Sequence, residues 1–196
     1  MNRIARRAAL AACIAFLAGG IGTAQAESIA LTNNVWQGFD VDQLTAVDQS
    51  TSWINVDTGN LLSFTLTTDV AGVLKVVDLG NAGDTFNVTI TGPGGVQHLT
   101  TSSVPATSSS SVTLNGADAA LADPAFSRGL FDLGPGTYTI TGSLLQSALI
   151  DGTALNATPG AIEFSTVPLP AGLSLLLSGL AALGAAARRR GVGVSA

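Results

Sequence analysis

Apolar and polar residues alternate along much of the chain between residues 52 and 165, as they do in strands that bury one face and expose the other. The run 85–91 shows the pattern clearly, because Phe86, Val88 and Ile90 alternate with threonine and asparagine. Clusters of Gly, Asn, Asp and Pro separate the runs, and such clusters are typical of turns. The strands predicted in this way cover residues 52–56, 62–68, 73–78, 85–91, 96–101, 129–133, 137–145 and 161–165.

Short strands at this spacing predict an all-β fold, and they favour an antiparallel β-sandwich of the jelly-roll or Ig-like kind. One helix is predicted at residues 117–122, between Gly116 and the pair Asp123-Pro124. Residues 27–166 are numerous enough for one domain with a hydrophobic core. We therefore expect a single β-sandwich domain over this range.

The first 26 residues have the three parts of a secretory signal peptide. Arginines at positions 3, 6 and 7 precede an apolar run over residues 8–21, and Ala24 and Ala26 form a small-x-small cleavage site. We expect cleavage after Ala26, so that the exported chain begins at Glu27.

Two other export signals share some of these letters. The four residues ending at Cys13 spell a lipoprotein box, but too few apolar residues precede the cysteine for that signal. Arg6 and Arg7 form a twin-arginine pair, but the residues after them lack the rest of that pattern. Removal of Cys13 with the signal peptide leaves no cysteine, which excludes disulfides and thiol catalysis in the exported domain.

Residues 167–196 begin with a Pro-x-Pro motif, continue as an uncharged apolar stretch and end near a basic cluster. A helix over residues 171–187 spans ~26 Å, which is the short limit for crossing a bilayer. Its leucine stripe also suits a helix packed on a soluble core, but its serine and alanine face carries no charge and favours the membrane. The arginines are expected on the cytoplasmic side. The motif consists of Val167, Pro168, Leu169, Pro170 and Ala171, and the membrane stop consists of Arg188, Arg189 and Arg190.

The order of proline motif, small-residue helix and terminal arginines resembles the VPLPA variant of the PEP-CTERM sorting signal. The resemblance implies that the chain is a substrate of an exosortase, an integral-membrane transpeptidase of Gram-negative bacteria that make extracellular polysaccharide. It further implies cleavage near the proline motif, which removes the hydrophobic tail.

The region from Trp53 onward also resembles the ectodomains that accompany this signal. That resemblance implies a β-sandwich surface protein associated with the polysaccharide matrix. The matching runs are FTLT at 64–67, VVD at 76–78, GDTF at 83–86, FDLGPGTYTI at 131–140 and IEFSTVP at 162–168.

Charge is distributed unevenly along the chain. All 13 acidic residues lie between Glu27 and Glu163, and this segment has only Lys75 and Arg128 as bases, which gives it a net charge of −11. Such a charge disfavours nucleic acid and anionic lipid as partners, and it attracts divalent cations. A second interpretation is that the acidity keeps an exported protein soluble and monomeric.

Asp78, Asn81 and Asp84 form the one interior cluster that suggests a binding site. Two carboxylates and an amide in a glycine-containing segment offer the oxygen ligands that Ca²⁺ prefers, although the spacing does not match an EF-hand loop. A polar hairpin turn, in which Asp and Asn bind their own backbone, explains the same residues. No cofactor other than calcium is expected.

Four aromatic residues are candidates for a platform on which sugar rings stack, although core packing is the commoner role of such residues in a sandwich. They are Trp36, Phe39, Trp53 and Tyr138. His98 is the only histidine, and one imidazole cannot form a zinc site, so we expect an ordinary strand or turn residue there.

No catalytic site is predicted, because hydrolysis of a polysaccharide needs paired carboxylates and no such pair shares a predicted strand face. We predict a non-enzymatic protein of the cell surface or extracellular matrix, anchored transiently by its C-terminal helix and structural or adhesive in biofilm. The expected partners are the exosortase, the inner membrane before processing, and extracellular polysaccharide. The alternative is a lectin-like carbohydrate-binding module with an exposed aromatic cluster and calcium dependence.

Overall fold

The computed structural model describes residues 26–107, 111–112 and 116–166, together with residues 176, 178–181 and 183. The predicted signal-cleavage residue Ala24, the predicted sorting motif 167–171 and the predicted membrane stop 188–190 lie outside the described residues. Processing at either end therefore stays a prediction.

Only a few positions of the predicted membrane helix are described, and those positions are helical. In the described part of the chain, no helix combines the length and the apolar character that a membrane span requires. The membrane helix over residues 171–187 also stays a prediction.

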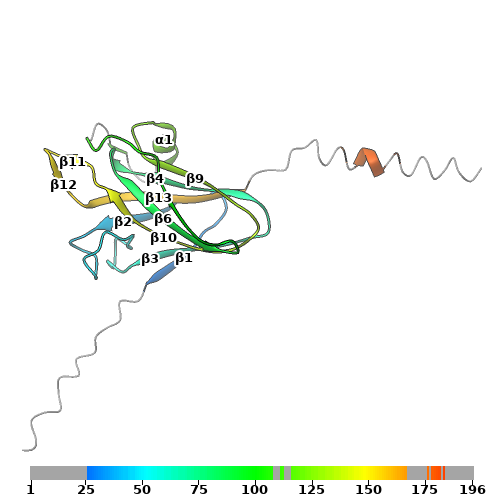
Figure 1. The fold of residues 1–196 in the computed structure, drawn as a ribbon, viewed down its shortest axis with the longest axis horizontal. Coiled ribbons are helices and arrows are strands. Elements are labelled where there is room, and N and C mark those ends of the chain that lie inside the picture. Colours follow the sequence, from blue (N-terminus) through cyan, green and yellow to red (C-terminus); the bar gives the residue numbers. More distant parts are fainter. Residues whose placement is uncertain are drawn as a thin grey trace, which may run out of the picture.

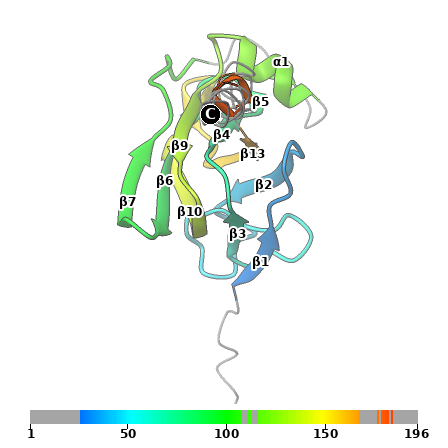
Figure 2. The same ribbon diagram turned by 90° about the vertical axis from the view of Figure 1, so that its right-hand side faces the viewer.

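Five strands form the first sheet, in the spatial order β1 (Glu27–Ala30), β3 (Leu62–Thr68), β10 (Gly136–Gln146), β6 (Thr85–Gly92) and β7 (Gly95–Thr100) (Figure 2). β1 pairs with β3 in parallel, and the other neighbours are antiparallel. Thr139 of β10 lies opposite Thr65 on one side and Thr91 on the other. Because these strands alternate apolar and hydroxyl-bearing residues, hydroxyl groups cover the outer face of this sheet.

Four strands form the second sheet, in the order β2 (Gln37–Asp42), β13 (Ala157–Thr166), β4 (Gly72–Asp78) and β9 (Arg128–Leu133), and all neighbours are antiparallel. Two short pairs lie outside the main sheets, β5 (Gly80–Asn81) with β8 (Ser111–Val112) and β11 (Leu149–Ile150) with β12 (Thr153–Ala154). The short helix α1 (Ala117–Ala122) lies between β8 and β9 in the chain.

The two sheets pack face to face, and their apolar positions meet between them. In Figure 2, β6 and β7 lie on one side of the molecule and β2 and β13 on the other. Phe39 of β2 stacks on Trp53 with ring centroids 4.0 Å apart, and it meets Phe86 of β6 edge-on at 5.2 Å. These rings join residues of both sheets, so the main core of the sandwich is centred on them.

A second, smaller core lies on the other face of the four-stranded sheet. Val77 and Ala161 point away from the main core, and they pack with Ala117 and Ala120 of α1 and with Phe126. Figure 1 shows α1 above this sheet. The helix therefore forms because it covers apolar sheet positions, since six residues alone make a marginal helix.

The predicted all-β sandwich and the helix at 117–122 are confirmed. The predicted strand at residues 52–56 is wrong, because this segment makes only isolated bridges from Ser52 and Ile54 to different partners. The sequence interpretation missed β1 and β2, since neither has a long alternating run, and it did not foresee the parallel pairing of β1.

Candidate functional site

Asp78 is the last residue of β4, and its side chain is completely buried. It has the same strand parity as Leu74 and Val76, which pack in the main core, so it faces the space between the sheets. Among the described residues, neither of its carboxylate oxygens has a hydrogen-bond partner. An unpartnered buried carboxylate is costly, because nothing replaces the hydration that the ion has lost.

Asp84 stands one residue before β6 and is also buried, with 2% of its surface exposed. One of its carboxylate oxygens accepts a hydrogen bond of 2.8 Å from the backbone N–H of Ala148. The two buried carboxylates therefore lie at the two ends of the segment that leads from β4 to β6. These strands belong to different sheets, so the segment is a crossover.

Burial, and then the nearby charge of Asp84, raise the pKa of Asp78 to about 9. The amides of Gly83 and Asp84 and the hydroxyl of Thr158 offset part of this rise, but none meets the geometry of a hydrogen bond to Asp78. Burial also raises the pKa of Asp84, against the hydrogen bond from Ala148. Both groups thus favour the neutral acid or a bound cation.

The polar hairpin expected at this segment is wrong, because β4 and β6 do not pair. Leu79 and Ala82 are buried in the second core, and they fix the crossover through apolar contacts. Asn81 lies in β5, opposite Ser111, and is half-buried. Among the hydrogen bonds of the described residues, none joins its side chain to either carboxylate. The structure thus brings Asp78 and Asp84 together and leaves Asn81 aside.

Basic side chains in the described chain are engaged elsewhere. Lys75 forms an ion pair of 3.2 Å with Glu163, and the guanidinium of Arg128 donates a hydrogen bond of 3.0 Å to the carbonyl of Leu121. His98 lies exposed on the edge strand β7, 3.1 Å from the hydroxyl of Thr89, as expected for an ordinary strand residue. No group of three His, Cys, Asp or Glu side chains converges within the described ranges.

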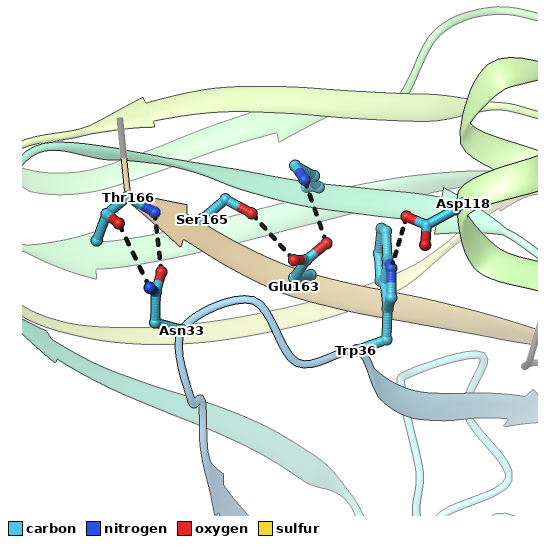
Figure 3. A network of polar contacts seen from close by, with 7 residues as sticks. Asn33, Trp36, Asp118, Glu163, Ser165 and Thr166 are labelled. Carbon is cyan, nitrogen blue, oxygen red and sulfur yellow. Dashed lines mark hydrogen bonds and ion pairs between the residues drawn. The ribbon is translucent and has the colours of Figure 1, made fainter. Parts of the chain in front are cut away.

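The aromatic platform proposed from the sequence is wrong. Trp53, Phe39 and Tyr138 are buried, and the first two stack on each other in the core. Trp36 is half-buried and donates a hydrogen bond of 3.0 Å to Asp118 on α1 (Figure 3). These aromatic rings pack inside the sandwich because they are its largest apolar groups.

A hollow of about 310 Å³ opens beside the segment that precedes β3. Trp53 lines it, and the indole N–H of this residue has no hydrogen-bond partner among the described residues. The polar residues around the hollow come from β3, β6, β10 and the segment 52–56. They are Ser52, Ser63, Asn87, Thr89, Thr141 and Ser143. Sequence reasoning missed this site, because these residues are adjacent only through strand pairing.

The end of β13 is fastened by Asn33, which sequence reasoning also missed (Figure 3). The backbone N–H of Thr166 donates to the side-chain oxygen of Asn33 at 2.9 Å, and the amide of Asn33 donates to the hydroxyl of Thr166 at 3.3 Å. The backbone N–H of Asn34 donates to the carbonyl of Phe164 at 2.8 Å. The strand is therefore held to its last described residue.

Comparison with protein-family models found no match, and neither did comparison with characterised proteins. Among solved structures, the chain is similar to the pre-peptidase C-terminal domain of a collagenase from Bacillus anthracis, with 10% sequence identity and a TM-score of 0.38. The match covers 72% of this chain and 95% of that domain. A similarity of this size assigns neither a fold nor a function.

Proposed function

We propose that the chain is an exported, non-enzymatic protein of the cell surface or extracellular matrix, structural or adhesive in role, and an exosortase substrate. The observation that carries the proposal is the junction between the fold and the sorting motif. Thr166 is the last residue of β13, and Val167 is the first residue of the motif. Cleavage within the motif thus removes no strand of the sandwich.

The position of β13 supports the same proposal. This strand lies inside the four-stranded sheet, paired with β2 on one side and β4 on the other. Its last residue is fastened by Asn33 through two hydrogen bonds. A tail attached to an inner strand leaves the fold complete both before cleavage, when it is anchored, and after cleavage, when it is released.

Intact mass and C-terminal peptide mapping of the protein from its own cells and medium test this proposal. We expect a species that begins at Glu27 and ends within residues 167–171. A species that retains residues 173–190 would mean a membrane-anchored ectodomain, and the exosortase proposal would fall.

Proline substitutions sharpen the test. Replacing Pro168 and Pro170 by Ala should leave the tail in place, because the recognition motif is lost. The matched control replaces Pro124 and Pro135, which lie in exposed parts of the sandwich. If the tail is still removed from the motif variant, as it is from the wild-type protein, the proposal is contradicted.

A second candidate function is carbohydrate binding in the hollow beside Trp53. The observation that favours it is a lining of hydroxyl and amide groups from β3, β6 and β10, since such groups can bind sugar hydroxyls. The expected aromatic platform plays no part in this candidate.

Binding of the host's extracellular polysaccharide tests the second candidate. Replacing Thr141 by Val and Ser143 by Ala removes two hydroxyls from the hollow, and we expect affinity to fall at least tenfold. The control replaces Thr67 and Thr137 by Val; these residues bond each other at 3.2 Å outside the hollow. Equal binding by both variants excludes the hollow as the site.

A further inference from the structure

We propose that Asp78 and Asp84 hold a divalent cation of the Ca²⁺ class, which links the two sheets of the sandwich. The first observation is the unpartnered carboxylate of Asp78, completely buried and next to a second buried carboxylate. Two adjacent buried acids repel each other when both are ionised, and a cation between them removes the repulsion.

The second observation is the absence of a protein counter-charge. In the part of the chain that the structure describes, Lys75 is paired with Glu163 and Arg128 donates to a backbone carbonyl. The buried carboxylates must therefore be neutralised by a proton or by an external cation. We propose neutralisation by a cation, and neutralisation by a bound proton is the alternative that the test distinguishes.

Ligand chemistry favours Ca²⁺ over other cations. The groups near the carboxylates offer oxygen ligands. The hydroxyl of Thr158 is near both acids and lowers the pKa of each, and it lies 3.3 Å from the carbonyl oxygen of Leu79. Calcium accepts carboxylate, hydroxyl and carbonyl oxygens in flexible arrangements, whereas zinc prefers nitrogen and sulfur. Magnesium keeps several of its waters, which suits a site closed to solvent poorly.

Topology gives the cation a structural role. Asp78 ends β4 in one sheet, and Asp84 precedes β6 in the other. A cation bound by both side chains joins the ends of the crossover, and it connects the sheets at a point where no hydrogen-bonded ladder does so. The inference does not depend on exosortase processing, because both residues lie within the folded domain.

Calorimetric titration with CaCl₂ tests the proposal, on protein purified from its own cells and freed of metal with a chelator. We expect one Ca²⁺ per chain, a higher Tm on binding, and a weaker effect of MgCl₂ at equal concentration. Protein that binds no Ca²⁺ and keeps its Tm overturns the proposal and leaves a protonated acid pair as the explanation.

Three variants assign the site. Asp78→Asn and Asp84→Asn should each weaken Ca²⁺ binding at least tenfold, whereas Asp132→Asn, an exposed residue of β9, should bind like wild type. If Asp78→Asn does not fold, Asp84→Asn alone decides the assignment. Wild-type affinity in Asp84→Asn, or an equal loss in Asp132→Asn, overturns it.

Discussion

The carboxylates of Asp78 and Asp84 lie at the two ends of one crossover between the sheets, and burial, followed by the charge of Asp84, raises the pKa of Asp78. Both side chains are buried, and within the described structure Asp78 has no hydrogen-bond partner. Two neighbouring buried carboxylates destabilise a sandwich of this size unless a proton or a cation neutralises them. We therefore expect the stability of the domain to depend on pH and on metal ions through this pair.

The metal-free protein should lose stability as the pH rises from about 4 to about 9. The pKa of Asp78 is about 9 in the folded state, against an ordinary value of about 3.9. The folded state thus binds this proton more tightly, so its contribution is complete below pH 4 and disappears as the pH passes through 9. The free energy of unfolding should fall by at most ~1.4 kcal/mol per pH unit for one proton.

Urea denaturation in a chelating buffer at pH 5, 7 and 9 measures this dependence. Asp84 and Asp40 act in the same direction, because burial raises the pKa of each. Glu27 and Asp48 have lowered pKa values, and their contribution is lost only on acidification below this window. Asp78→Asn should flatten the profile, and a flat wild-type profile would show that Asp78 is not neutral in the fold.

Gly142→Ala should destabilise the fold by about 1–3 kcal/mol, because overpacking a core forces side chains and backbone to move. A Cβ at Gly142 overlaps the indole ring of Trp53, which has no room to shift while it stacks on Phe39. Urea denaturation followed by tryptophan fluorescence measures the loss. Gly94→Ala is the control, since the nearest atom lies 3.8 Å away on Gln97; equal losses in both variants contradict the packing argument.

Lys75→Met should destabilise the domain by about 1–3 kcal/mol, because it leaves a buried charged acceptor without its main partner. Glu163 has only 7% of its side chain exposed, and it keeps just the hydrogen bond of 3.0 Å from Ser165. Denaturation at pH 7 measures the change. In Lys75→Met/Glu163→Gln the loss should be smaller, and a double variant as unstable as the single one would refute this account.

Asn33→Ala should cost about 1 kcal/mol and expose the end of β13 to proteases, because it removes both hydrogen bonds to Thr166. Limited carboxypeptidase digestion, followed by mass spectrometry, detects the released strand end. Gln97→Ala on the exposed edge strand β7 serves as the control. Digestion that stops at the same residue in both variants would mean that Asn33 does not hold the strand.

Local sequence patterns predict part of the fold. The run 62–68 alternates as far as Thr67 and forms β3 over the predicted residues, and the helix at 117–122 has the predicted bounds. The segment 52–56 has β-branched residues but forms no strand, because Trp53 and Ile54 are bound by core contacts and bridges to separate partners. The sequence predicts a polar cluster around Asp78, as a calcium site or a hairpin turn, but it does not predict that Asp78 and Asp84 lie at the ends of a crossover between two sheets.

The β class, the position of most strands and the acidic character of the domain could be predicted from the sequence, because these depend on neighbouring residues and on composition. The signal peptide and the sorting signal stay predictions. Long-range packing sets the burial of Asp78, which has no hydrogen-bond partner among the described residues, the stacking of Trp53 on Phe39, and the contact of Asn33 with Thr166. A period of two assigns each side chain to one face of its strand. It does not say which strands pair or what covers that face, since those contacts join residues far apart in the chain.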